Sequence, residues 1–493
     1  MENIEHLKAE RAQEWRAEIR EKMKAKDRTK IEKVHMPEED PFVRNKSNIE
    51  VNTGLTEKQA LLEASRCLDC ANPTCITGCP VGINIPKFIK KIEAKDFLGA
   101  ASVLKETNAL PAVCGRVCPQ EIQCEAQCFY TQKLKLPGIS IGHLERFAAD
   151  FERESGKMSV PEVAACNGIK VACVGGGPAS LSAAGDLIKY GYDVTVFEAL
   201  HEIGGVLKYG IPEFRLPNNV VNVEIENLKK MGVKFITNFI VGKTASLDTL
   251  REEGFKAFFV ASGAGLPNFM NIPGENLINI FSSNEYLTRV NLMNAANGEF
   301  DTPVFSGKNV AVIGGGNTAM DSVRTAKRLG ADRSMIIYRR SREEMPARVE
   351  EVKHAIEEDI EFMNLNSPVE YISDENGKVK AMILQKMELG EPDSSGRRRP
   401  IPLEGSEYEV PVDTVVVAVG VSPNPLIPKS LPDLEVSKWG TIIVNDRMQS
   451  SIEDIFAGGD IVRGGATVIL AMGDGRDAAK GMHEYLQEKY LSK

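Results

Sequence analysis

The sequence predicts an α/β protein in which a helical, cysteine-rich region precedes two parallel-sheet domains. One observation is the segment IKVACVGGGPASLSAAGDLIKYGYDVTVFE at 169–198, where an apolar run meets three glycines and a helical pattern and a second apolar run follow. Another is the repeat of this pattern in NVAVIGGGNTAMD at 309–321. A chain of 493 residues also exceeds what one core usually organises, so about three domains are expected.

The first Gly-rich unit predicts a dinucleotide site. Gly175 and Gly177 let the backbone turn tightly and approach a pyrophosphate, and the following helix directs its free N–H groups at the phosphates. Ser180 takes the third position of the fingerprint and is still small enough for helix–strand packing. Glu198 ends the second strand with a carboxylate placed to accept hydrogen bonds from ribose hydroxyls.

The second Gly-rich unit, with Gly314 and Gly316, differs at the end of its second strand. There the sequence reads MIIYRRSR and supplies Arg339, Arg340 and Arg342 instead of a carboxylate. Guanidinium groups bind a 2′-phosphate in bidentate fashion, whereas a carboxylate would repel it. This site should therefore prefer NADP to NAD, the alternative being that the arginines only end a strand at the surface.

Two more segments belong to the first unit. HEIGGVLKYGIPEFRLP at 201–217 contains too many glycines and prolines for a regular element, and its cations Lys208 and Arg215 either stabilise charge on a reduced flavin or are solvated. A strand near 455 ends in Gly459 and Asp460, which places the carboxylate against a ribityl or phosphate hydroxyl.

A helix that begins near Thr467 can direct its N-terminus at the isoalloxazine edge of such a flavin.

All cysteines except Cys166 and Cys173 fall in two groups, CLDCANPTCITGCP from Cys67 and CGRVCPQEIQCEAQC from Cys114. Two thiol-rich loops joined by a helix over 86–104, each with a Cys-Pro pair, favour iron–sulfur clusters. Zinc is the competing interpretation, since paired cysteines also suit tetrahedral sites. Spacing alone does not assign the thiols to clusters.

Composition excludes several classes of function. The net charge of −9, with basic residues spread along the chain, argues against a nucleic-acid partner. No apolar run approaches the ~20 residues that cross a bilayer, and the charged N-terminus does not resemble a signal peptide. We expect a cytoplasmic protein without a membrane partner.

Residues 1–45 form a charged arm. Ile4, Leu7, Trp15 and Ile19 would share one face of a helix, although Arg11 interrupts that face. The arm is therefore either an amphipathic segment that docks on another surface or a solvated, partly frayed one.

These motifs together resemble the glutamate synthase small-subunit family. The family includes the large subunit of NADH-dependent ferredoxin:NADP reductase, the sulfide dehydrogenase α-subunit and the N-terminal half of dihydropyrimidine dehydrogenase. The resemblance covers nearly the whole chain from Met36 and rests on RCLDCANPTCITGCPVGINIP, CGRVCPQEIQCEAQC, GGGPASL, YGIPEFRLP, GGGNTAMD, YRRSREEMPAR and FAGGD, in that order.

The resemblance implies two [4Fe–4S] clusters with interleaved ligands, and Cys114 as a spare thiol. The implied ligands of one cluster are Cys67, Cys70, Cys75 and Cys128, and those of the other are Cys79, Cys118, Cys124 and Glu145.

It also implies FAD in the first Gly-rich unit and NADPH in the second, with the NADPH domain at 300–412 inserted in an FAD domain at 166–299 and 413–493, behind a helical cluster domain at 46–165. The implied FAD residues are Gly175, Gly177, Ser180, Glu198, Gly205, Arg215, Gly459, Asp460 and Thr467, and the implied NADPH residues are Gly314, Gly316, Asn317, Thr318, Arg339 and Arg340.

In that scheme NADPH delivers a hydride to the flavin, which passes single electrons through the clusters to a second subunit. The partner is a glutamate synthase large subunit, since this chain is too short to hold an amidotransferase. The alternative is the bifurcating large subunit of ferredoxin:NADP oxidoreductase, with a small flavoprotein partner and ferredoxin as acceptor. A structural or sensing protein with clusters as folding staples is a third interpretation, which the two intact Gly-rich units disfavour.

Overall fold

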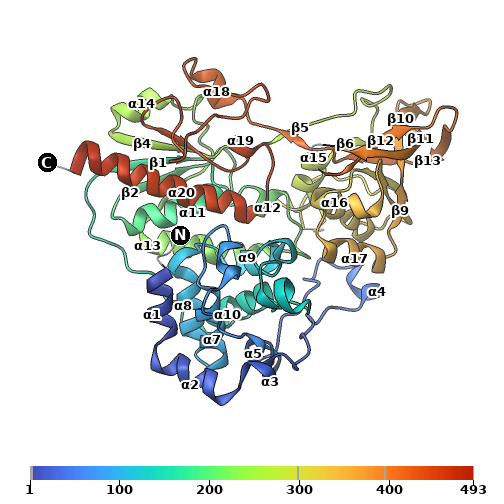
Figure 1. Cartoon of the computed structure of the whole chain (residues 1–493). Helices are drawn as coiled ribbons and strands as arrows, with labels where there is room; N and C mark the ends of the chain where they lie inside the picture. Colours follow the sequence, from blue (N-terminus) through green and yellow to red (C-terminus); the bar gives the residue numbers. More distant parts are fainter. Residues whose placement is uncertain (1–3, 297–298, 394–395, 492–493) are drawn as a thin grey trace.

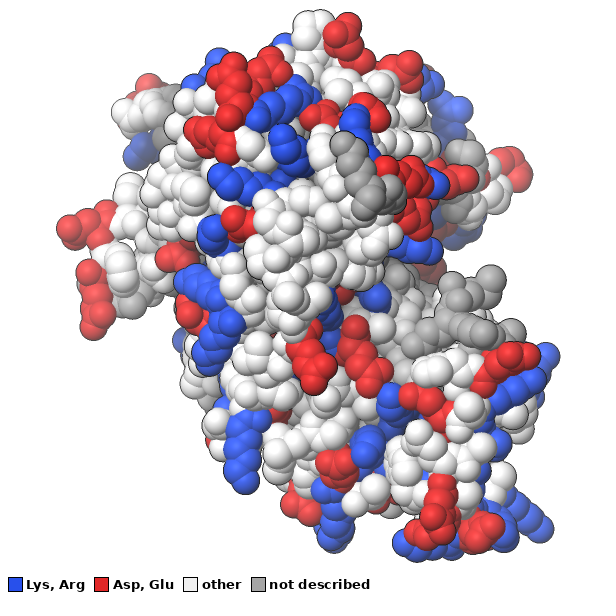
Figure 2. Space-filling model, turned by 90° about the vertical axis from the view of Figure 1, so that its left-hand side faces the viewer, with Lys and Arg blue, Asp and Glu red and all other residues white. Residues whose placement is uncertain are grey.

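A computed structural model describes residues 4–296, 299–393 and 396–491. Three regions are visible in Figure 1: a helical domain in blue and teal at the bottom, an α/β domain in green and red at the upper left, and a second α/β domain in yellow and orange at the right. Basic and acidic side chains are interspersed over the face in Figure 2. No helix of the described residues is long and apolar enough to cross a membrane.

The helical domain is built on two long helices, α8 and α10, with shorter ones around them. The helices are α1 (Ile4–Arg11), α2 (Glu14–Lys22), α3 (Ala25–Arg28), α4 (Pro41–Arg44), α5 (Glu57–Arg66), α6 (Thr74–Thr77), α7 (Ile85–Glu93), α8 (Phe97–Thr107), α9 (Pro111–Val117) and α10 (Ile141–Ser155), with short turns η1 (Gln120–Ile122) and η2 (Tyr130–Leu134). Thr56 and Gln59 form a capping box at the start of α5, as their spacing predicts. The single helix predicted over 86–104 is wrong: Lys95 adopts a left-handed conformation and Asp96 caps α8, so the chain forms two helices there.

The arm is docked, which decides between the two interpretations of residues 1–45. Ile19 is buried, and so is Arg16 beside it. Trp15 lies under the ammonium group of Lys91 on α7. The docked face therefore contains buried arginine side chains as well as apolar ones. For this reason an arginine at position 11 does not prevent docking.

The first α/β domain contains a parallel five-stranded sheet in the order β16-β4-β1-β2-β3. Its strands are β1 (Lys170–Val174), β2 (Asp193–Phe197), β3 (Lys234–Ile236), β4 (Phe255–Val260) and β16 (Ile455–Ala457). Its helices are α11 (Pro178–Lys189), α12 (Val206–Tyr209), α13 (Asn218–Met231), α14 (Leu247–Glu252), α18 (Leu426–Ser430), α19 (Asp460–Arg463) and α20 (Val468–Leu486), which continues into η4 (Gln487–Leu491). The predicted βαβ unit is thus β1, α11 and β2.

The second α/β domain has a parallel sheet in the order β6-β14-β7-β8-β9 and an antiparallel sheet beside it. The parallel strands are β6 (Ile280–Ser282), β7 (Asn309–Ile313), β8 (Arg333–Tyr338), β9 (Glu361–Asn364) and β14 (Thr414–Val417). The antiparallel strands are β10 (Asn366–Ser373), β11 (Val379–Pro392), β12 (Arg398–Pro402) and β13 (Tyr408–Pro411). The helices are α15 (Ser283–Val290), α16 (Asn317–Arg328) and α17 (Val349–Glu357), with the turn η3 (Arg342–Glu344).

The second domain is inserted in the first, and the insertion is longer than 300–412. Strands β6 and β14 belong to its sheet because β14 pairs with both β6 and β7. The chain leaves the first domain through β5 (Leu266–Pro267) and returns to it through β15 (Val421–Ser422). These two strands pair with each other. The boundaries therefore lie near these short strands.

Helices α11 and α20 pack closely through small residues. A Cβ atom added at Gly475 on α20 would overlap the carbonyl oxygen of Ala179 on α11. Ser182 of α11 also donates a hydrogen bond to the carbonyl of Met472, 2.9 Å away. Both helices therefore begin at the same edge of the parallel sheet.

Gly475→Ala should destabilise the protein by about 1 to 3 kcal/mol, because the two backbones would have to move apart. Thermal unfolding of the cofactor-loaded protein tests this. Gly265→Ala is the control, since an added Cβ there meets nothing within 4 Å. Equal unfolding midpoints for the two variants would contradict the close packing.

Candidate functional site

The first Gly-rich turn places a carboxylate beside backbone donors at the edge of the sheet. Gly175 has φ +102°, and a Cβ there would lie 2.5 Å from the carbonyl oxygen of Ala261. Glu198 is buried and accepts hydrogen bonds from the N–H groups of Gly176 (2.5 Å) and Leu200 (2.8 Å). Burial raises the pKa of Glu198. Its carboxylate is thus fixed where a ribose would lie, next to the start of α11.

The start of α11 has room and unpaired polar groups for a ligand. A Cβ added at Gly177 would meet nothing within 4 Å. The hydroxyls of Ser180 on α11 and Ser262 after β4 are buried and lack a hydrogen-bond partner within the described residues. Buried polar groups are normally paired. The residues present therefore fit a bound dinucleotide at this edge.

Three further segments converge on this edge. A Cβ added at Gly205 would lie 2.9 Å from Cα of Gly177, so the loop after Glu198 passes directly over the turn. Gly459 follows β16 and donates its N–H to Asp474 of α20, 2.9 Å away. Asp460 accepts from the N–H of Ala466 at 2.9 Å, and burial raises its pKa.

Thr467 caps α20 by accepting from the N–H of Leu470, so α20 begins where the sequence predicts.

Tyr209 on α12 is a candidate that the sequence reasoning missed. Burial raises the pKa of its phenol to about 12, and the charges of Asp460 and Glu198 add to that rise. The phenol therefore lies within electrostatic range of both carboxylates. A tyrosine in a loop broken by glycine and proline carries no periodic signal, so the sequence could not identify it.

The two cations proposed for this loop have protein partners instead. Arg215 is buried and lies 2.7 Å from Asp321 of α16 and 2.9 Å from Glu351 of α17. Lys208 donates to the side chain of Asn222 at 2.5 Å. Of the two interpretations of Arg215, a solvated side chain is therefore wrong, and its charge is matched by two carboxylates of the other domain.

The second Gly-rich turn repeats the first. Gly314 has φ +141°, close to the carbonyl of Ala418. A Cβ added at Gly316, which precedes α16, would meet nothing within 4 Å. Asn317 accepts a hydrogen bond from the N–H of Arg348 at 2.9 Å, and Thr318 beside it is exposed.

The arginines after β8 do not lie together. Arg339 is exposed at the end of the strand, whereas Arg340 is buried and binds Asp393 at 2.8 Å and the carbonyl of Arg398 at 2.7 Å. Consecutive residues leaving a strand point to opposite sides. Arg340 therefore holds the hairpin between β11 and β12, whereas Arg339 and Arg342 are exposed and available to a ligand.

Four thiols line one cavity in the helical domain. They are Cys67, Cys70, Cys75 and Cys128, which is the first set that the family resemblance implies. Apolar side chains such as Ile85, Ile89 and Phe129 complete the walls of the cavity. Burial raises the pKa of the Cys67 thiol to about 12. Thiolates here require a compensating positive centre, which metal ions supply.

The second set also lies together. Burial raises the pKa of Cys79 and Cys124, and a hydrogen bond with Cys114 together with burial raises that of Cys118. The charge of Glu145 raises the pKa of all three thiols further, so it lies near each of them. Glu145 is buried and accepts from Asn108 at 2.8 Å.

Burial and the charge of Glu224 raise the pKa of Glu145 to about 8, although Asn108 opposes this. Without a bound cation the protonated carboxyl is therefore favoured, and a cation at this position would favour the carboxylate.

The spacing of the sulfur atoms favours clusters over a single zinc ion. In the described residues no three cysteine sulfurs lie within 4.8 Å of one another. A tetrahedral zinc site with Zn–S bonds of about 2.3 Å holds its sulfurs about 3.8 Å apart. A four-iron cluster is larger and holds its ligands farther apart, which fits both sets.

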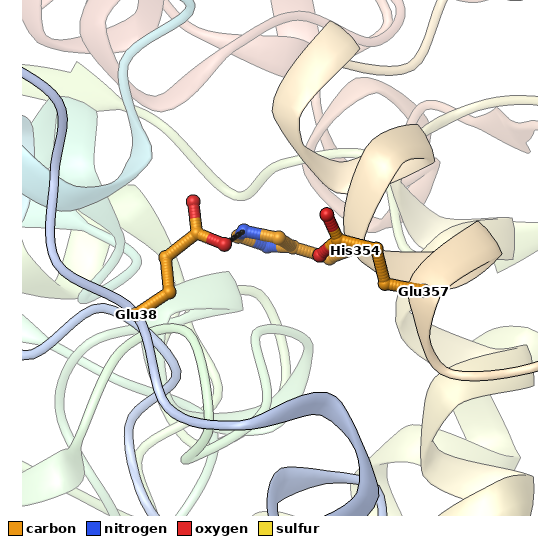
Figure 3. A group of neighbouring side chains, drawn as sticks. All are labelled: Glu38, His354 and Glu357. Carbon is orange, nitrogen blue, oxygen red and sulfur yellow. Dashed lines mark ion pairs between the residues drawn. The ribbon is translucent and has the colours of Figure 1, made fainter.

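Only one group in the described residues has three potential metal-ligating atoms within 4.8 Å, and it is better explained by ion pairs. Glu38 and the α17 residues His354 and Glu357 point toward one another (Figure 3). Arg44 lies 2.5 Å from Glu357 and 3.3 Å from Glu38, and Lys353 lies 2.9 Å from Glu38. These cations already balance the carboxylates, so the group ties the last part of the arm to the second α/β domain.

The comparisons with known proteins agree with this geometry. Residues 44–157 match the family described as dihydropyrimidine dehydrogenase domain II, 4Fe-4S cluster. Residues 169–475 match the pyridine nucleotide-disulphide oxidoreductase family. The boundary between the two matches falls between α10 and β1.

Two similar proteins of comparable length share the same name. The chain is 37% identical over 465 residues to the glutamate synthase [NADPH] small chain of Azospirillum brasilense, covering 92% of this chain and 95% of that one. It is 37% identical to the protein of the same name in Escherichia coli, covering 93% and 98%. It is also 37% identical to the NADP(+)-dependent formate dehydrogenase subunit beta of Moorella thermoacetica, covering 84% of this chain and 60% of that one.

Among solved structures, FprA of Mycobacterium tuberculosis in complex with NADPH is similar with a TM-score of 0.56 and 21% identity, covering 66% of this chain and 86% of that one. At that identity the likeness concerns the fold alone.

Arg215→Gln should destabilise the protein by about 3 to 5 kcal/mol, since it leaves the buried Asp321 without its ion pair and Glu351 with Arg324 alone. Burial raises the pKa of Glu351, but Arg215 and Arg324 lower it to about 2. The ion pairs of Glu351 therefore stabilise the protein at pH values above the pKa of this group in the unfolded chain. This stabilisation is lost as the pH falls toward 2. Without Arg215 the pKa of Glu351 rises, so the loss should be larger at pH 8 than at pH 5.5. Unfolding midpoints at both pH values test this.

Arg251→Gln is the control, because its pair with Asp454 is partly exposed and should contribute about 0 to 1 kcal/mol. A loss for Arg215→Gln that does not depend on pH would contradict the assignment.

Proposed function

Since the chain belongs to the glutamate synthase small-chain family of NADPH-dependent oxidoreductases with FAD and [4Fe–4S] cofactors, we propose that it passes electrons from NADPH to a separate partner subunit in the cytoplasm. Bound FAD would accept a hydride from NADPH and release single electrons to the clusters. The chain itself contributes binding and orientation, and no acid or base is required.

The FAD site lies at the common start of α11 and α20. Glu198 holds the ribose, Ser180 and the N–H groups of α11 bind the pyrophosphate, and Asp460 binds a hydroxyl of the ribityl chain. The α20 N-terminus stabilises negative charge at the flavin edge. Gly205 brings the covering loop close enough to exclude water from the turn.

The NADPH site lies at the start of α16. Gly314 and Gly316 leave the backbone open to the pyrophosphate, and Asn317 and Thr318 provide polar groups in the first turn. Arg339 binds the 2′-phosphate, and Arg340 supports it by fixing the neighbouring hairpin. This division of roles follows from the exposure of Arg339 and the ion pair between Arg340 and Asp393.

The proposed direction of electron transfer rests on one observation, which is that the second cysteine set lies against α20. Cys114 is 3.6 Å from the sulfur of Met472, and a Cβ added at Gly473 would lie 3.1 Å from the carbonyl of Pro80, which follows Cys79. The first set lines a different cavity, walled in part by the half-exposed Phe129. This arrangement supports two [4Fe–4S] clusters in series, the second set nearer the flavin and the first set nearer the partner.

The partner decides the overall reaction. A glutamate synthase large subunit is favoured because the relatives that match over nearly their whole length carry that name. The formate dehydrogenase beta subunit indicates that a similar module also serves other complexes. A bifurcating ferredoxin:NADP reductase remains the second candidate, with a small flavoprotein as partner.

The test is anaerobic reduction of the purified chain by NADPH, followed by addition of each candidate partner. Glutamate formation from glutamine and 2-oxoglutarate with a large amidotransferase subunit supports the first candidate. Reduction of ferredoxin with a small flavoprotein supports the second. A chain that contains zinc and no flavin would overturn both.

Arg339→Gln should lower kcat/KM for NADPH by roughly 10- to 100-fold and leave that for NADH unchanged, because a charge-assisted hydrogen bond to the 2′-phosphate is lost. Arg333→Gln is the matched control, since Arg333 starts β8 at the opposite end and pairs with Glu361. An unchanged ratio of the two kcat/KM values in Arg339→Gln would remove its phosphate role.

Cys75→Ala should lower the iron content by about half and remove the first cluster alone, and Cys124→Ala should remove the second alone. Glu145→Ala should alter only the cluster that Cys124→Ala removes. Cys114→Ala is the control and should keep all the iron. Iron analysis and electron paramagnetic resonance of the reduced protein measure these effects, and loss of both signals in every variant would contradict separate ligand sets.

A further inference from the structure

The N-terminal arm reaches the loop that bears two of the first-set cysteines. Asp69 lies between Cys67 and Cys70, has φ +51° and is completely buried. Its carboxylate pairs with Arg16, which is also buried, and with Arg20 at 2.6 Å. Arg11 donates to the Asp69 carbonyl at 2.7 Å. Three guanidinium groups of α1 and α2 therefore converge on one residue of this loop.

The rest of the loop is held in the same way. Lys90 of α7 is completely buried and donates to the carbonyl of Cys67 at 2.6 Å. Arg28 of α3 donates to the carbonyl of Ser65 at 2.5 Å, and both cations pair with Glu93. The cations around the loop thus outnumber the carboxylates, Asp69 and Glu93, that face it.

The arm is itself anchored beside this loop. Glu10 of α1 binds Lys87 and Asn84 on α7, both at 2.6 Å. Trp15 lies 4.7 Å from the ammonium group of Lys91. A frayed arm could not hold Arg16 and Arg20 against a buried carboxylate, so these contacts fix the charge in place.

We propose that the arm is a positioning element for the first cysteine site, which fixes the Cys67–Cys70 loop and raises the reduction potential of the cluster bound there. The inference rests on the proposed function. An iron–sulfur cluster gains negative charge on reduction, and its potential depends on local charge and hydrogen bonding. Positive charge held in a buried, weakly screened environment stabilises the reduced form. The buried carboxylate of Asp69 would be costly without its arginine partners.

The test compares Arg20→Gln with Arg20→Lys in the cofactor-loaded protein, by redox titration with paramagnetic resonance detection. Arg20 is chosen because it is partly exposed and because its replacement keeps the ion pair between Arg16 and Asp69. In Arg20→Gln the potential of the first cluster should become more negative while that of the second stays unchanged, and Arg20→Lys should restore it. The signal that disappears in Cys75→Ala identifies the first cluster.

Arg289→Gln removes one positive charge from α15 and controls for net charge. Arg11→Gln is the second variant if Arg20→Gln does not fold, and the same negative shift is expected. Equal potentials in wild type and the Gln variants, or an equal shift in Arg20→Lys, would overturn the inference. Wild-type protein without two clusters would instead overturn the proposed function and leave the arm contacts to be explained as structural.

Discussion

The arrangement of the sites depends on the close contact between α11 and α20. Gly475 against Ala179 brings the two helix N-termini to one edge of the sheet. The next residue of α20, Arg476, pairs with Asp186 of α11 at 2.9 Å and also donates to the carbonyls of Val81 and Thr107 in the helical domain. One helix therefore fixes the proposed flavin edge and the second cysteine set relative to each other.

A second constraint acts between the domains. Arg215 joins the loop over the proposed FAD site to α16 and α17, and Arg44 joins the last part of the arm to Glu358, which also binds Arg324 and Arg328. Glu358 is completely buried, and although burial raises its pKa these guanidinium groups hold it well below its usual range. Buried pairs of this kind contribute little net stability but strongly penalise their separation. They therefore fix the position of the NADPH domain more than they stabilise the fold.

The parts of the fold that the sequence predicts are those governed by local chemistry. Strand, glycine turn and helix occur in order at Gly175 and Gly314, and the caps at Thr56 and Thr467 start their helices where expected. The roles of Arg215 and Arg340 could not be predicted, since each depends on a carboxylate distant in sequence or on the direction of a side chain leaving a strand.

Docking of the arm was one of two interpretations of its sequence, but its partner could not be predicted, for the same reason. Its partner Asp69 is distant in sequence, and nothing in the pattern of residues 1–45 indicates it.

The cations around the first cysteine set give the proposed path a direction. Arg11, Arg16, Arg20 and Lys90 surround the loop of the first set, whereas Glu145 and Glu224 are buried beside the second, and burial raises the pKa of both carboxyls, to about 8 and about 7. An added electron is disfavoured near carboxylates and favoured near cations, and low-dielectric surroundings strengthen both effects. Electrons that enter at the flavin edge of α20 are therefore drawn through the second set toward the first, away from the flavin, by charges that the protein holds in place before any partner binds.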